Sequence, residues 1–148
     1  MSDLPISYVE RMERTDFGYC LAFLGAPDGT AILPADVSSI DLGVFDLADP
    51  SVNIYPVTGM SPTASPAIIL DPPAVADGWN SNSQGAGGRN FRHYLKLSDV
   101  EGGGTTTIGG HKYRCEYTVN TDPYDGSSGN WGPIKVVQVV TVLPLSSS

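Results

Sequence analysis

The sequence predicts an all-β protein, organised as a sandwich of about seven short antiparallel strands. Three observations lead to this fold class. Apolar side chains alternate with polar ones over several short stretches, which is the two-residue period of a half-buried strand. The chain contains 17 Gly and 12 Pro, so tight turns are frequent. Only 16% of its residues are charged, and long amphipathic helical stretches are absent from the sequence.

The clearest strand signals lie near the C-terminus. Over residues 112–119, aromatic, cysteine and valine side chains at odd positions alternate with polar side chains at even positions. The apolar run over residues 134–142 is dominated by valine, whose β-branched side chain favours a strand over a helix. We expect these two runs to pair as a hairpin that closes an antiparallel sheet.

The entry to the first of these strands carries a second signal. Tyr113 follows the Gly109-Gly110 pair and precedes Cys115 by two residues. This arrangement resembles the tyrosine corner of immunoglobulin-like sandwiches. The predicted fold is therefore an immunoglobulin-like antiparallel β-sandwich with Tyr113 in its core.

The first part of the chain is predicted as an arm followed by a strand. Residues 1–16 have little to bury and are expected to form an N-terminal arm, with at most a helical turn or two over Val9–Arg14. The next strand begins at Phe17, and its alternation is expected to place Phe17, Tyr19 and Leu21 on the core face.

A turn over residues 26–29 has a physical cause, because proline presets φ and glycine tolerates positive φ. Pro34 or Asp36 is then expected to start a single helical turn. The following strand has its core face at Ile40 and alternate residues, and it ends in the polar corner over residues 46–50.

Prolines bound the middle strands. The runs over residues 52–57 and 67–70 are expected to form edge or sheet-crossing strands, because proline cannot donate to a central ladder. Residues 71–90 are expected to form a long loop, whose length suggests function or disorder. A fifth strand is predicted over residues 91–97, before the final hairpin.

The length of 148 residues suits one domain with a full core. We expect the sandwich to span residues 17–143, with a flexible tail over residues 144–148. The sequence starts without a basic and apolar leader and has no apolar run of membrane-spanning length, so cytoplasmic synthesis is expected. With only Cys20 and Cys115, reduced thiols are favoured, although a bridge is geometrically possible if their strands face each other.

The net charge of −8 is unevenly distributed. Residues 1–75 carry two basic and ten acidic residues, whereas residues 76–148 carry six of each. An acidic half repels phosphate backbones, which argues against nucleic acid as a partner. The neutral half holds a basic cluster that would either meet an acidic neighbour or form a solvated face; it consists of Arg89, Arg92, His93 and Lys96.

Catalytic chemistry is not predicted. The sequence has no Gly-x-Ser-x-Gly motif, and both histidines, His93 and His111, lie at strand positions. The candidate carboxylates Asp46, Asp49 and Asp77 are explained more simply as turn caps.

Metal and cofactor sites are not predicted either. The cysteines and histidines lack zinc-site spacing. The oxygen-rich stretch over residues 120–130 lacks the spacing and terminal glutamate of a calcium loop. The glycine tracts lack the Gly-Lys-Ser/Thr ending that a phosphate loop needs.

Contact residues are the remaining candidates. Large aromatic side chains in loops either stack on a sugar ring or anchor a protein interface. Arginines in the arm and the basic cluster would add charged contacts. The predicted interaction residues are Tyr8, Arg11, Arg14, Trp79, Arg89, Arg92, Tyr124 and Trp131.

Three segments together resemble a known class of proteins. They are the Asp28-Gly29-Thr30-Ala31-Ile32 run before a strand, Asn90-Phe91-Arg92, and Gly110-His111-Lys112-Tyr113-Arg114. They are similar to segments of small immunoglobulin-like virion proteins of tailed bacteriophages, and of the N-terminal domain of the phage baseplate upper protein. The resemblance covers residues 17–142. This chain differs in its long Gly/Asn/Ser loop, and we expect it to have no attached receptor-binding or fibre domain.

The resemblance implies a non-enzymatic structural protein of a phage particle, assembled in the host cytoplasm and located in the virion. We expect a capsid decoration (cement) protein that binds the outer shell and is homo-oligomeric in the particle. The alternative position is a neck, tail-adaptor or baseplate subunit. A carbohydrate-binding or host-adhesion module is a further alternative, and neither nucleic acid nor a membrane is expected as a partner.

Overall fold

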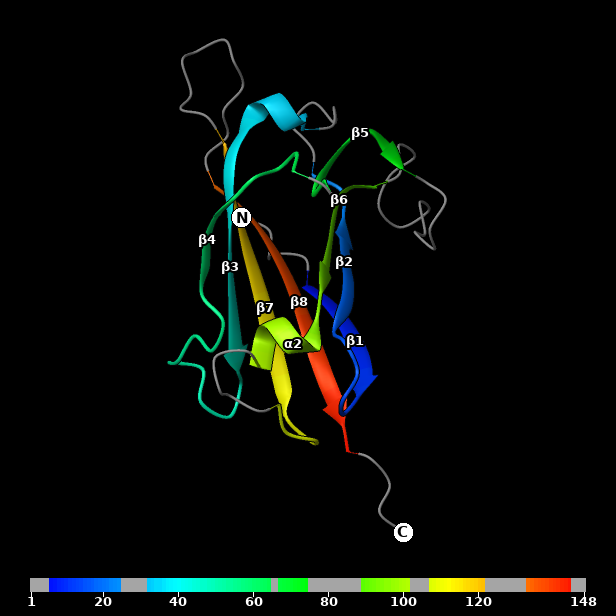
Figure 1. Cartoon of the computed structure of the whole chain (residues 1–148), viewed down its shortest axis with the longest axis vertical. Helices are drawn as coiled ribbons and strands as arrows, with labels where there is room; N and C mark the ends of the chain where they lie inside the picture. Colours follow the sequence, from blue (N-terminus) through cyan, green and yellow to red (C-terminus); the bar gives the residue numbers. More distant parts are fainter. Residues whose placement is uncertain are drawn as a thin grey trace.

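The computed structural model describes residues 6–24, 32–64, 67–74, 89–101, 107–121 and 133–144. Within these residues, eight strands form two sheets, so the all-β prediction is confirmed (Figure 1).

The larger sheet has five strands. Its order from one edge to the other is β1 (Ile6–Met12), β8 (Ile134–Leu143), β7 (Lys112–Thr121), β3 (Val37–Asp46) and β4 (Val57–Met60). The smaller sheet has the order β2 (Gly18–Ala22), β6 (Arg89–Leu95) and β5 (Ile69–Ala74). A short 3₁₀ turn, η1 (Pro34–Asp36), precedes β3 as expected, and a helix that was not predicted, α2 (Leu97–Glu101), follows β6.

The predicted closing hairpin is confirmed. β7 and β8 pair antiparallel in an unbroken register from Lys112 opposite Thr141 to Val119 opposite Ile134. On its other side β7 pairs antiparallel with β3, so β7 lies at the centre of the larger sheet. Figure 1 shows β3, β7 and β8 running along the long axis of the molecule.

The core lies between the two sheets. Alternate residues of β3 and β7 are buried, as the two-residue period predicted. Aromatic contacts join the layers, with ring centroids 5.1 Å apart for Phe91 and Tyr117 and 5.7 Å apart for Phe17 and Tyr113. One contiguous cluster therefore receives side chains from both sheets, which is the arrangement of a sandwich.

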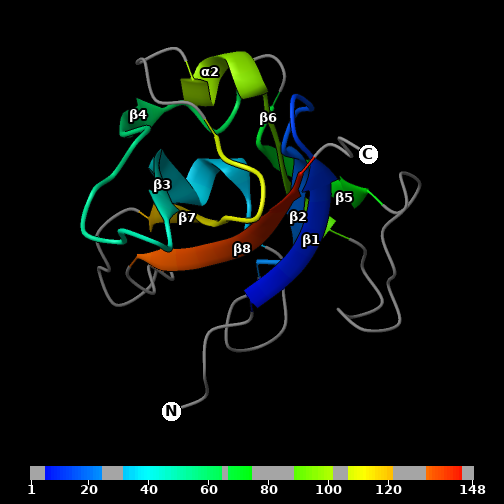
Figure 2. The same ribbon diagram turned by 90° about the horizontal axis from the view of Figure 1, so that it is seen from below.

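The N-terminal arm needs correction. Ile6–Met12, which we expected within a free arm over residues 1–16, forms β1 and pairs parallel with β8. Val9 packs against the core cluster, so the segment buries more than its composition suggested. Figure 2 shows β1 lying alongside β8 at the edge of the larger sheet. The helical turn expected over Val9–Arg14 is also wrong.

The facing of β2 needs correction as well. Tyr19 is 51% exposed, whereas Cys20 is buried. The chain turns at Gly18, whose φ of +85° lies in a region that favours glycine, and this turn separates Phe17 from the strand that follows. Phe17 and Cys20 can therefore both face the core, although a single continuous strand would place them on opposite faces.

The proline-bounded strands lie at sheet edges, as expected from proline's missing N–H group. β4 and β5 are edge strands of their sheets, and β5 contains Pro72 and Pro73. Their bounds differ from the prediction, because residues 51–56 form turns and bends before β4. The fifth predicted strand is observed as β6, which ends at Leu95. Two residues later, the Leu97 amide donates a hydrogen bond to the Asp16 carboxylate instead of to a neighbouring strand.

Candidate functional site

A hollow of about 420 Å³ lies beside the smaller sheet, where β6 meets the segment that joins β4 to β5. Its volume is in the range of small-ligand and side-chain pockets. The apolar part of its lining includes Met60, the last residue of β4, together with Ala67 and Ile68 of that connecting segment. The aromatic and charged part comes from β2, β6 and the residue after β6.

Two tyrosines line the hollow as a pair. Tyr19 of β2 and Tyr94 of β6 are directly opposite in the antiparallel register, so their side chains share one face of the sheet. Their rings meet edge to face with centroids 4.9 Å apart. The Arg92 guanidinium lies over the Tyr19 ring, 5.9 Å from its centroid. Both tyrosines are exposed, so this pair presents aromatic surface to a partner.

Asp16 fixes the position of Tyr94. Its carboxylate accepts hydrogen bonds of 2.7 Å from the Leu97 amide and from the Tyr94 hydroxyl. The bond from the Leu97 amide lowers the pKa of Asp16 most, and the bond from Tyr94 lowers it further, so the carboxylate is ionised at neutral pH. Because Tyr94 is already held, a partner would lose little conformational entropy on contacting it.

His93 connects the hollow to the core. The ring lines the hollow, and its Nδ1 lies 2.7 Å from the hydroxyl of the buried Tyr117. Burial lowers the pKa of His93, and the negative charge of Asp99 opposes this effect in part. His93 is therefore a neutral ring at neutral pH.

The charge of the lining differs from that of the whole chain. Arg92 and Lys96 are the charged side chains among the described residues that line the hollow, and no carboxylate lines it with them. The chain as a whole has a net charge of −8. The hollow is thus a locally basic and aromatic site on an acidic protein.

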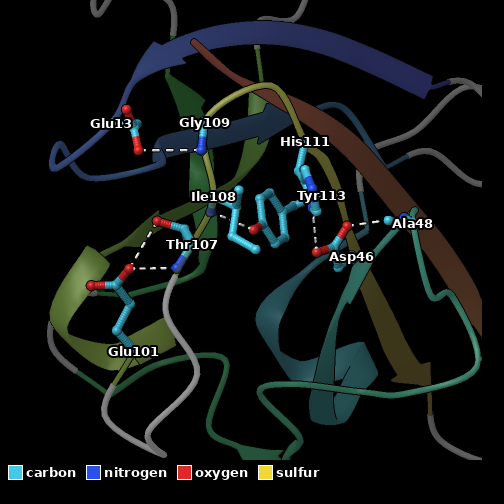
Figure 3. A network of polar contacts seen from close by, with 9 residues as sticks. All are labelled: Glu13, Asp46, Ala48, Glu101, Thr107, Ile108, Gly109, His111 and Tyr113. Atoms are coloured by element: carbon cyan, nitrogen blue, oxygen red, sulfur yellow. Dashed lines mark hydrogen bonds and ion pairs between the residues drawn. The ribbon is translucent and has the colours of Figure 1, made fainter. Parts of the chain in front are cut away.

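A second polar network pins the entry to β7 (Figure 3). The Tyr113 hydroxyl accepts a 2.7 Å hydrogen bond from the Ile108 amide, the upstream backbone contact expected of a tyrosine corner. Glu101 of α2 accepts hydrogen bonds from both the amide and the hydroxyl of Thr107. Tyr113 is only 1% exposed, so the prediction of a core residue is confirmed.

The same network contains an Asp–His pair. Asp46 Oδ2 lies 2.7 Å from His111 Nδ1. Burial favours the neutral form of Asp46, but hydrogen bonds from the Ala48 amide and His111 outweigh it and lower the Asp46 pKa. In the described part of the chain, His111 has no serine or cysteine as a hydrogen-bond partner, so the pair lacks the nucleophile of a catalytic triad. The pair joins the end of β3 to the start of β7.

The other candidate carboxylates behave as turn residues where they are described. Asp49 accepts a hydrogen bond from the Ser51 hydroxyl within its own turn, and Asp46 caps the Ala48 amide. Asp77 lies outside the described residues.

The structure describes the side chains of four of the eight predicted interaction residues, and of these four only Arg92 lines the hollow. Arg92 lines the hollow, whereas Tyr8 is 74% exposed on β1 and Arg14 lies in the exposed turn after β1. Arg11 has a structural role, because its Nε donates a 3.0 Å hydrogen bond to the Phe17 carbonyl. The side chain of Arg89 lies outside the described residues, as do Trp79, Tyr124 and Trp131.

Sequence reasoning found the cations of the hollow but missed its tyrosines. Arg92, His93 and Lys96 of the predicted basic cluster do come together there. Tyr19 was placed on the core face because the alternation was started at Phe17. Starting it at Cys20, an often buried residue type, would have placed Tyr19 outward.

Both thiols lie in the shared core. Cys20 of β2 and Cys115 of β7 are buried and unbridged. Burial raises the pKa of Cys20 to about 12, and burial with the neighbouring Cys20 sulfur raises the pKa of Cys115. Neither thiol is therefore a nucleophile at neutral pH.

Among the described ranges, no set of three or more His, Cys, Asp or Glu side chains is arranged to hold a metal ion. No described helix combines the length and apolar character required to cross a membrane. Comparisons of the chain with protein-family models, curated proteins and solved structures found no match.

Proposed function

We propose that this chain is a non-enzymatic binding module built on an immunoglobulin-like sandwich. The strand order supports the fold assignment. If β2, β3, β4, β5, β6, β7 and β8 are strands B, C, C′, D, E, F and G, one sheet has the order B-E-D and the other G-F-C-C′. This order matches that of the two sheets of the immunoglobulin architecture, with β1 added beside the strand that corresponds to G.

Two local features support the same assignment. Tyr113 lies near the start of β7, two residues before Cys115, where the tyrosine corner of strand F belongs. Cys20 and Cys115 lie on the strands B and F that carry the inter-sheet disulfide of antibody domains. The chain departs from antibody domains in leaving these cysteines unbridged and in having no tryptophan on β3.

The observation that carries the binding role is the hollow beside the smaller sheet. Tyrosine and arginine are the residue types enriched where protein interfaces gain most of their affinity. Here exposed Tyr19 and Tyr94 occur together with Arg92 beside apolar side chains, and Asp16 holds Tyr94 in place. This arrangement suits the binding of a partner better than the activation of a nucleophile or a water.

Within this class we propose a structural protein of a tailed-phage particle, most specifically a capsid decoration protein. The support is the resemblance of residues 17–142 to phage virion proteins, together with the sandwich architecture. Many weak contacts suffice on a repeating shell, because multivalency multiplies their effect. A neck, tail-adaptor or baseplate subunit is the alternative position.

Electron cryo-microscopy of particles that contain the chain tests this proposal. A decoration protein would appear as density of sandwich shape repeated over the outer shell. Density confined to a neck, tail or baseplate ring would remove the decoration role and keep the virion role. If complete, purified phage particles contain no copy of the chain, the virion role is contradicted altogether.

A further inference from the structure

The hollow restricts what its occupant can be, because its lining combines two kinds of surface. One part is apolar, from Met60, Ala67 and Ile68, and the other is cationic, from Arg92 and Lys96. A partner that fills both must present an apolar group and a negative charge within the span of a few residues.

The distribution of charge limits the length of a negatively charged partner. Residues 1–75 carry a net charge of −8, so a long polyanion would be repelled by most of the molecule. A nucleic acid is therefore disfavoured, while a short acidic segment at the hollow would meet fewer of these negative charges. Lys96 is exposed and directly follows β6, so it can reach a carboxylate at the rim of the hollow.

The geometry of the aromatic pair disfavours a sugar. Sugar rings stack on an open aromatic face, and in this site the Arg92 guanidinium already covers one face of the Tyr19 ring at 5.9 Å from its centroid. Tyr94 packs edge to face with Tyr19, and its hydroxyl is bonded to Asp16. The two rings act as a fixed wall for an apolar side chain rather than as a flat platform.

We propose that the hollow binds a short acidic segment of a partner protein, with an apolar side chain against Met60 and Ile68 and carboxylates on Arg92 and Lys96. This inference rests on the proposed binding function and names the chemistry of its partner. Tyr19 and Tyr94 would form the wall against which the apolar side chain packs.

The test uses the folded full chain and a fluorescein-labelled peptide of alternating glutamate and leucine, followed by fluorescence polarisation at low ionic strength. Saturable binding is expected for this peptide. Peptides of alternating lysine and leucine, or of glutamate and glycine, should bind much more weakly, because each lacks one of the two required features. Failure of the glutamate–leucine peptide to saturate would overturn the inference.

Two exposed lysines supply matched variants. Lys96→Glu and Lys112→Glu change the net charge equally, but only Lys96 lines the hollow, since Lys112 lies on β7 of the other sheet. Replacing an attraction by a repulsion in Lys96→Glu should weaken binding by about tenfold or more, while Lys112→Glu should change it less than about twofold. Equal losses in the two variants would show a non-specific charge effect and overturn the inference.

The same variants separate this inference from the proposed virion role. If the chain is incorporated into particles, and the Lys96→Glu and Lys112→Glu variants are incorporated equally well, the virion role is supported but the hollow is not the binding site. A glycan that competes with the peptide at the hollow, or self-association of the chain that Lys96→Glu abolishes, would replace the acidic segment by another occupant and overturn the inference.

Discussion

The same residue type serves different purposes in the two sheets. In the larger sheet, Tyr113 and Tyr117 are 1% and 0% exposed and fill the space between the layers. In the smaller sheet, Tyr19 and Tyr94 are 51% and 39% exposed and line a hollow on the surface. The difference follows from what lies opposite each face, because only the inner faces of the sandwich are covered by another sheet.

The two sheets also differ in the length of their strands and in the regularity of strand pairing. β3, β7 and β8 are each ten residues long, and β7 pairs along its length with both neighbours. The pairing of β5 with β6 is irregular between Ile69 and Ala74. We infer that the larger sheet provides most of the stability, and that the smaller sheet provides a surface whose side chains are available for contact.

The largest effect is expected from removing β1. Deleting residues 1–12 takes away the parallel partner of β8 and uncovers core residues that Val9 packs against. Cooperative thermal unfolding, followed by circular dichroism, should be lost or shifted further down in temperature than by any single substitution. Deleting residues 1–5, which precede β1, is the control and should leave the transition in place. A chain without residues 1–12 that melts like the full chain would contradict a structural role for β1.

The next effect concerns Tyr113, which is buried between the sheets. Tyr113→Ala should lower the free energy of unfolding by about 3–5 kcal/mol, because it leaves a large cavity between the sheets. Tyr113→Phe keeps the ring but loses the hydrogen bond that the hydroxyl accepts from the Ile108 amide and its hydrogen bond with Asp46, so a smaller loss of about 1–2 kcal/mol is expected. Denaturant titrations of both variants measure these values. A change near zero for Tyr113→Ala would be incompatible with its burial.

A buried amide should matter within the smaller sheet. Asn90 is fully buried, and its side chain bonds to the amide and carbonyl of Leu24 and to the carbonyl of Ile32. Asn90→Ala leaves these backbone groups without their partner, and a loss of about 2–3 kcal/mol in unfolding free energy is expected. Asn53→Ala removes an exposed cap of the Val44 amide and should have the smaller effect in the same titration. A larger loss of unfolding free energy in Asn53→Ala than in Asn90→Ala would contradict the structural role given to Asn90.

His93 predicts a dependence of stability on pH. Burial lowers its pKa in the folded protein below the ordinary value of 6.5, so the unfolded chain takes up the proton at a higher pH than the folded one. The contribution to stability is therefore complete above pH 6.5 and is lost as the pH falls through that value. The slope can reach about 1.4 kcal/mol per pH unit for one proton.

Denaturant titrations at about pH 7.5 and about pH 5.5, two values that bracket the ordinary histidine pKa, measure this slope. In His93→Gln the decrease over this interval should be smaller than in the unmodified chain. An identical decrease in stability in the two proteins would show that titratable groups other than His93 cause it.

The smallest effect is an absence of reaction. Cys20 and Cys115 are buried, and burial raises the pKa of both thiols, so neither should react with a thiol reagent at neutral pH in the folded protein. Two thiols per chain should react after unfolding in denaturant. Rapid reaction of the folded protein would place a thiol at the surface.

The parts of the fold that sequence predicted well are those with an unambiguous two-residue period. In β7, polar and apolar residues alternate from Lys112 to Val119, and in β3 the apolar residues Ile40, Leu42 and Val44 recur with the same period, so both strands and their buried faces were predicted correctly. The two cations of the hollow, Arg92 and Lys96, were also predicted to cluster with His93, because the three residues are close in sequence.

The remaining features depend on contacts that sequence spacing does not encode. β1 becomes a strand because β8 offers it an edge, which lies more than a hundred residues away in the chain. The outward facing of Tyr19 depends on the turn at Gly18, and its neighbour Tyr94 is more than seventy residues distant. The hollow exists only when these segments come together with residues 60–64 and 67–68.

Hydrogen exchange of the backbone amides, measured for the full chain alone and with the glutamate–leucine peptide, tests the division between the two sheets most directly. Alone, the slowest exchange should occur in β7 and β8. With the peptide, exchange should slow in residues 60–68 and 92–96 and remain unchanged in β7 and β8. Slowest exchange in β5 and β6 of the protein alone, or peptide protection centred on β1 or on β3 and β4, would contradict this division.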